Sequence, residues 1–62
     1  MDQQDISKMI RQLRAGLDLT QEQFAAKIGV TFSTVNRWEN SVSKPSPLAM
    51  LRIKRVQKQE KQ

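Results

Sequence analysis

The sequence predicts an all-α fold, a small domain of four short helices. Apolar residues recur at intervals of three and four along four separate segments, which is the spacing that places them on one side of a helix. The alternation of apolar and polar residues that marks a half-buried strand is nowhere sustained. Residues that cap or terminate helices stand between the segments, at Thr20, Gly29, Thr31 and Ser46.

The first predicted helix begins near Asp5, whose carboxylate suits a helix N-terminus. Its end is open between Gly16 and Asp18. We favour Asp18, because Leu17 continues the apolar stripe and Asp tolerates a left-handed conformation better than most residues. Gly16 then lies inside the last turn, where it costs up to about 1 kcal/mol relative to Ala. The stripe that faces the core consists of Ile6, Met9, Ile10, Leu13 and Leu17.

The second predicted helix begins after Thr20. Gln23 stands three residues later, so the two side chains can form a capping box. Phe24, Ala25 and Ile28 then follow at helical spacing. We expect Gly29 to end this helix, because a backbone with positive φ costs glycine least.

The third predicted helix runs from Phe32 to Asn40, with Thr31 as its N-cap. Its apolar stripe is Val35 and Trp38, and we expect Trp38 to lie in the core. Two helices joined by a short turn that contains glycine form a helix-turn-helix arrangement. The second helix of such a pair can enter the major groove of DNA.

The fourth predicted helix begins at Pro47, because Ser46 can cap it and proline suits its first position. We expect it to end at about Gln57. Its apolar residues lie on two sides: Leu48 and Leu51 on one, and Ala49, Ile53 and Val56, with Met50 at the margin, on the other. One side seals the core and the other is left spare. We expect a homodimer contact through this helix, at Ile53 and Val56.

Length and composition bound the class of protein. At 62 residues the chain is short, so we expect one domain over residues 1–62, with a core at about 5–57 and a frayed basic tail over 58–62. Cysteine and histidine are absent, and no paired carboxylates stand out. We therefore expect no enzymatic activity, metal or cofactor. Without an apolar run of roughly 20 residues or a signal peptide, a cytoplasmic protein away from membranes is expected.

The net charge of +5 is concentrated in the last third of the chain. The positive and negative charges of residues 1–40 cancel. A polyanionic partner accounts for this distribution, and so does a merely solvated basic helix face. Against Glu60 alone, residues 41–62 carry Lys44, Arg52, Lys54, Arg55, Lys58 and Lys61.

The run from Leu13 to Ser46, LRAGLDLTQEQFAAKIGVTFSTVNRWENSVSKPS, resembles the phage-repressor and Cro-like helix-turn-helix family. The shared features are Leu-Arg at the end of the first helix, Leu-Thr-Gln before the second, and Ala-x-x-x-Gly-Val before the turn. Arg-Trp-Glu-Asn and then Lys-Pro-Ser complete the pattern. The resemblance implies a lambda-repressor-like fold and binding of double-stranded DNA. Here the sequence ends with the fourth helix, whereas many members add a fifth.

The resemblance also implies roles for individual residues. Gln21 matches a glutamine that in relatives contacts a DNA phosphate and can brace a base-reading side chain. Arg37 is the best candidate for a base contact, because a guanidinium can bind guanine O6 and N7 together. Phe32 either packs against thymine methyl groups or folds onto the turn. The expected DNA contacts are Thr20, Gln21, Thr31, Phe32, Ser33, Thr34, Asn36, Arg37, Asn40, Ser43 and Lys44.

Three further positions carry structural expectations from the resemblance. Arg14 and Glu39 match a pair that forms an internal salt bridge in many members. Such a pair would tie the first helix to the end of the third. The family usually has glycine where this chain has Ser41, so the left-handed turn there is less favourable.

These observations favour a small transcriptional regulator that binds specific double-stranded DNA through the helix at 32–40. Two alternatives stay open. In the first, the chain is the antitoxin of a toxin–antitoxin pair, and its tail binds the toxin. In the second, it is a protein-interaction module that keeps the fold without reading DNA. The second is supported by the low basicity of the third helix, whose one basic residue is Arg37.

Overall fold

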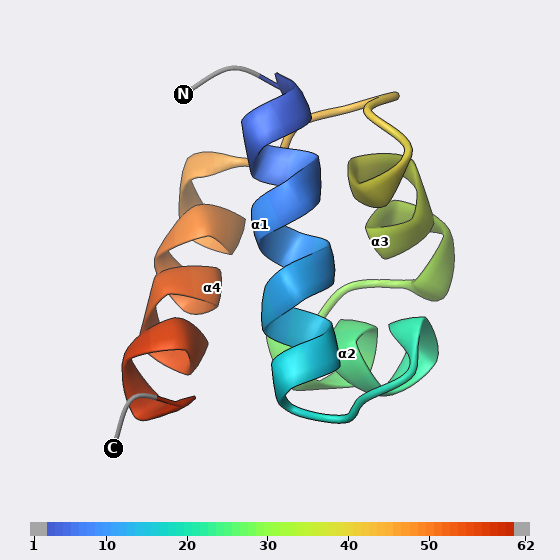
Figure 1. Cartoon of the computed structure of the whole chain (residues 1–62). Coiled ribbons are helices and arrows are strands. Elements are labelled where there is room, and N and C mark those ends of the chain that lie inside the picture. The colour runs from blue at the N-terminus through green and yellow to red at the C-terminus, as the bar shows by residue number, and fades with distance from the viewer. Residues whose placement is uncertain (1–2, 61–62) are drawn as a thin grey trace.

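The computed structural model of the chain describes residues 3–60 and contains four helices (Figure 1). No strand is present among these residues, so the predicted all-α class is confirmed. Figure 1 shows α1 through the centre of the view, with α4 on its left, α3 on its right and α2 at its lower end. The helices are α1 (Gln3–Gly16), α2 (Gln21–Ile28), α3 (Phe32–Glu39) and α4 (Pro47–Glu60).

Three of the helices end in the same backbone motif. A residue with positive φ follows each of α1, α2 and α3: Asp18 at 57°, Gly29 at 90° and Ser41 at 61°. In each case the next N–H group bonds back across the turn to a carbonyl five residues earlier, which is the Schellman pattern. The predictions for Asp18 and Gly29 are confirmed. The bonds join Leu19 to Arg14 (3.1 Å), Val30 to Ala25 (2.9 Å) and Val42 to Arg37 (2.9 Å).

The predicted starts of α2, α3 and α4 are also confirmed. Thr20 and Gln23 form both halves of a capping box at α2. The Thr31 hydroxyl accepts a bond from the Thr34 N–H at the start of α3. At α4, the Ser46 hydroxyl accepts from the backbone N–H three residues later at 3.2 Å. The turns on either side of α2 are therefore set by local contacts, which fixes where α3 begins.

One apolar cluster joins the four helices. The predicted stripes of α1, α2 and α3 all contribute to it, and Trp38 is only 3% exposed, as predicted. Contacts run from α1 to α3, from α3 to α2, and from α2 to α4. The buried members of the apolar cluster are Ile6, Ile10, Leu13, Phe24, Ala25, Ile28, Val35, Trp38, Ala49, Ile53 and Val56.

The predicted dimer contact on α4 is wrong. Ile53 is fully buried and Val56 is 7% exposed, so both belong to the core and neither is available to a second copy. The exposed apolar side of α4 carries Leu48 and Leu51. Spacing defines the two apolar sides of a helix, but only the packing of α4 against the other helices decides which side is covered.

Some helix bounds also differ from the predictions. α1 already includes Gln3, two residues before the predicted start at Asp5. α3 ends at Glu39, and Asn40 is its C-cap. α4 continues to Glu60, so the frayed tail predicted over 58–62 is wrong for residues 58–60, and residues 61–62 lie outside the described part of the chain.

Candidate nucleic-acid interface

The side of α3 that faces away from the core is uncovered. Val35, Trp38 and Glu39 hold the helix from behind and are all buried. On the opposite flank the chain leaves Phe32 half exposed, and Ser33, Arg37 and Asn40 exposed. A polar helix surface with an anchored back can therefore meet a partner without rearrangement of the core. We call this surface, made of Phe32, Ser33, Asn36, Arg37 and Asn40, the α3 flank.

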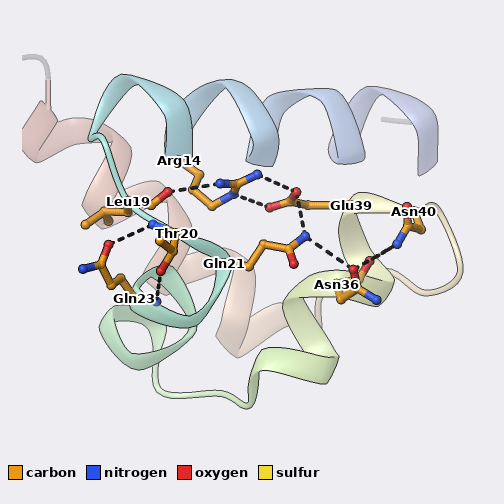
Figure 2. Close-up of polar contacts among 8 residues, drawn as sticks. All are labelled: Arg14, Leu19, Thr20, Gln21, Gln23, Asn36, Glu39 and Asn40. Carbon is orange, nitrogen blue, oxygen red and sulfur yellow. Dashed lines mark hydrogen bonds and ion pairs between the residues drawn. The ribbon is translucent and has the colours of Figure 1, made fainter.

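A salt bridge between α1 and α3 fixes the position of the α3 flank (Figure 2). Arg14 donates from Nε to Glu39 Oε2 at 2.7 Å and from Nη2 to Glu39 Oε1 at 3.0 Å. A third bond joins Arg14 Nη1 to the Leu19 carbonyl at 3.1 Å. The hydrogen bonds to Glu39 and the charge of Glu39 raise the pKa of Arg14 above its usual value, so Arg14 stays charged. The structure thus contains the pair that the resemblance implied.

Gln21 connects this salt bridge to the α3 flank. Its amide nitrogen donates to Glu39 Oε1 at 3.1 Å and, at the longer distance of 3.4 Å, to Asn36 Oδ1 (Figure 2). Both amide hydrogens are therefore used inside the protein. The side-chain oxygen that is left is an acceptor, which does not suit a phosphate. This geometry fits the bracing role of Gln21 better than a phosphate contact from its side chain.

Asn40 also uses its amide within the protein. Its Nδ2 donates to the Asn36 carbonyl at 2.9 Å and to Asn36 Oδ1 at 3.1 Å. Asn36 Oδ1 therefore accepts from two amides, one on either side. Its own Nδ2 is left as a donor on a half-buried side chain. The neighbours of Asn36 thus determine which group it presents.

The remaining polar residues of α3 and its N-cap are arranged by local bonds. The Thr31 and Thr34 hydroxyls lie 2.9 Å apart and share a hydrogen bond. Arg37 makes one weak contact, from Nε to the Ser33 carbonyl at 3.4 Å. Its two terminal amino groups stay available on an exposed side chain.

Two other segments lie beside α3 in the fold. The first turn of α2 begins at Gln21, and backbone N–H groups there have no acceptor within the helix. After α3, the connection to α4 contains half-buried Ser43 and exposed Lys44. The predicted contact residues thus come from three segments: the start of α2, the exposed side of α3 and the following loop.

Two polar contacts were missed by the sequence reasoning. Ser7 is buried in α1, where its hydroxyl bonds the Trp38 carbonyl and lies 2.7 Å from the Ser41 hydroxyl. This contact ties α1 to the strained end of α3. The sequence did contain a signal for this contact, because Ser7 stands three residues before Ile10 and therefore on the side of α1 that packs against α3. For the second contact, from Arg52 Nη1 to the Ile28 carbonyl at 3.0 Å, the sequence contains no comparable signal.

Within residues 3–60, no three His, Cys, Asp or Glu side chains gather closely enough to hold a metal ion. No helix in the same part of the chain has the length and apolarity to cross a bilayer.

The fold and the α3 flank define a helix-turn-helix protein. A family model described as Helix-turn-helix matches residues 10–56, and the chain belongs to this family of phage-repressor and Cro type. Members are DNA-binding regulators, and transcription regulation is typical of them. Comparisons with curated proteins and with solved structures found no significant match.

Proposed function

We propose that this protein is a small transcriptional regulator that binds specific sequences of double-stranded DNA, with α3 in the major groove. The observation that carries the proposal is the α3 flank, which is polar, exposed and anchored from behind by Val35 and Trp38. A helix of this kind fits the major groove, where base edges can be read. The net charge of +5 supplies attraction to the phosphates.

Arg37 is the proposed main base-reading residue. Its two terminal amino groups have no bond within the described residues, and the side chain is exposed at the last turn of α3. A guanidinium can donate two bonds in parallel to O6 and N7 of one guanine. Such a pair discriminates against the wrong base by about 1–3 kcal/mol. We therefore expect a guanine in the bound sequence.

Asn36 is proposed as a second reader, restricted to donating. An asparagine that recognises adenine must both donate to N7 and accept from the N6 amino group. In this protein Asn36 Oδ1 already accepts from Gln21 and Asn40, so only its amino group is free. We expect Asn36 to prefer an acceptor, such as guanine O6 or N7 or thymine O4.

Phosphate contacts are proposed on either side of α3. The Gln21 and Glu22 N–H groups in the first turn of α2 have no acceptor within the helix, and the partial positive charge of a helix N-terminus favours an anion. Thr20, Thr31 and Ser33 supply hydroxyl donors near the starts of α2 and α3. On the other side, Ser43 and Lys44 extend the contact along the backbone. These contacts set the register of α3 and carry no sequence information.

Selection of bound sites from random duplexes tests the proposal. We expect a short motif that contains guanine, and each wrong base pair should cost about 1–3 kcal/mol. Arg37→Ala should relax the preference at one position, and the matched variant Arg11→Ala, which removes an exposed charge from α1, should leave the motif unchanged. Recovery of no motif, with equal affinity for every duplex, would favour a protein-interaction module instead.

A further inference from the structure

A pocket of about 420 Å³ opens between the end of α2 and the second half of α4. Its wall includes Lys27, Gly29, Arg52 and Arg55, and none of the proposed DNA contacts lines it. The pocket lies at the C-terminal end of α2, whereas the proposed DNA interface uses the N-terminal end of the same helix. We call it the basic pocket.

The charge in the basic pocket is unbalanced. Lys27, Arg52 and Arg55 are all exposed, and no carboxylate is among the lining residues. Among residues 4–59, whose side chains the structure describes, no acidic side chain lies within ion-pair distance of any of the three. The sequence adds to this imbalance, since residues 40–59 contain five basic and no acidic residues. Among the side chains that the structure describes, no carboxylate neutralises the positive charge of the pocket.

Arg52 is held in place before any ligand binds. Its Nη1 donates to the Ile28 carbonyl at 3.0 Å. The guanidinium also lies directly over Gly29, where a Cβ atom would come within 2.7 Å of the same nitrogen. Glycine at this position thus leaves the room that the guanidinium occupies. The other N–H groups of Arg52 remain available, and a fixed donor loses less entropy on binding than a mobile one.

Part of the lining of the basic pocket is apolar. Ile28 and Val56 contribute this part from the edge of the core, Val56 with the larger exposed fraction. A site that combines an apolar part with cationic side chains suits a ligand that has an apolar side chain next to carboxylates. The volume falls within the range of about 300–1,000 Å³ typical of ligand pockets, which exceeds the needs of a single phosphate ion.

We infer that the basic pocket binds an acidic segment of a partner protein, with carboxylates on Lys27, Arg52 and Arg55 and an apolar side chain over Ile28 and Val56. A second copy of this chain is a poor occupant, because it carries the same charge of +5. Free phosphate is also disfavoured, because it would leave Ile28 and Val56 without an apolar partner.

Titration of the full chain with a blocked peptide of sequence ELDELE tests this inference, observed by amide and arginine Nε–H NMR signals. We expect saturable shifts at Gly29, Arg52 and Arg55, and no shift along the α3 flank. Arg55→Glu should weaken binding at least about fivefold, through loss of one attraction and gain of one repulsion. The control Lys54→Glu makes the same charge change at an exposed site of α4 outside the pocket lining, and it should weaken binding less than about twofold. If Arg55→Glu does not fold, Lys27→Glu takes its place.

Four results would overturn the inference. The first is equal binding of the uncharged peptide QLNQLQ, and the second is an equal loss of affinity in Lys54→Glu and Arg55→Glu. The third is that inorganic phosphate at the same concentration produces the same shifts, which would make the pocket a simple anion site. The fourth is that a DNA duplex, and not the peptide, shifts the signals of the pocket, which would make it part of the DNA interface.

Discussion

Arg14→Met should destabilise the protein far more than removal of any other exposed or half-exposed cation. The side chain of Glu39 is 4% exposed, and its carboxylate accepts two hydrogen bonds from Arg14 and one from Gln21. Methionine keeps the length of the side chain and removes both bonds from Arg14 to Glu39, together with the bond to the Leu19 carbonyl. The carboxylate would then be buried with one amide as its partner.

The structure sets the size of this effect. Removal of one partner from a fully buried ion pair costs about 3–5 kcal/mol. The Arg14 side chain is 24% exposed, so water can reach the site and lower the cost to roughly 2–4 kcal/mol. A 62-residue domain has a total stability of roughly 3–9 kcal/mol. The variant should therefore lose a large part of its stability, and its Tm should fall by more than about 10 °C.

Thermal and urea unfolding, followed by far-UV circular dichroism, measures this loss. Arg11→Met removes an exposed cation from the same helix and should change stability by less than about 0.5 kcal/mol. In the double variant Arg14→Met with Glu39→Gln no buried charge is left, so it should recover at least half of the loss. If Arg14→Met were as stable as Arg11→Met, the salt bridge would contribute no more than a surface pair and the reasoning would be refuted.

Three other substitutions follow from the same structure. Lys44→Ala should weaken DNA binding similarly on all sequences and reduce the salt slope by about one unit, and an unchanged slope would remove it from the phosphate contacts. Ile53→Asp should cost more than about 4 kcal/mol and unfold the domain, whereas Leu51→Asp, at a half-exposed site, should leave it folded. Equal tolerance of both by circular dichroism would contradict the placement of α4. Gly29→Ala should lower the stability by about 1–2 kcal/mol, and the urea midpoint with it, because φ at Gly29 is 90°, a conformation that L residues rarely adopt. An unchanged midpoint would argue against the left-handed backbone at Gly29.

The helix ends could be predicted from the sequence because they depend on near neighbours. Thr20 with Gln23, Gly29, and Ser46 with Pro47 each act within a few residues, so their chemistry is visible in the chain. Asp18 was favoured over Gly16 on similar grounds. The apolar stripes of α1, α2 and α3 were equally local, because each of them has only one apolar side.

The rest depends on how distant segments meet. α4 has two apolar sides, and the choice between Leu51 and Ile53 is made by contact with the other helices, so the predicted dimer surface was wrong. The amide of Gln21 is used by Glu39 and Asn36, which lie 15 to 18 residues further along the chain. Spacing alone could place Gln21 at the start of α2, but it could not reveal that its hydrogens were already taken.

Binding to duplexes with 7-deazapurines at single positions of the selected site tests directly whether Arg37 reads a guanine in the major groove. This change removes the N7 acceptor from the major groove and leaves the Watson–Crick pairs intact. We expect that substitution of one guanine weakens binding by about tenfold in the native protein and has little further effect in Arg37→Ala. Indifference of the native protein to every such substitution would contradict the claim that the α3 flank reads the major groove.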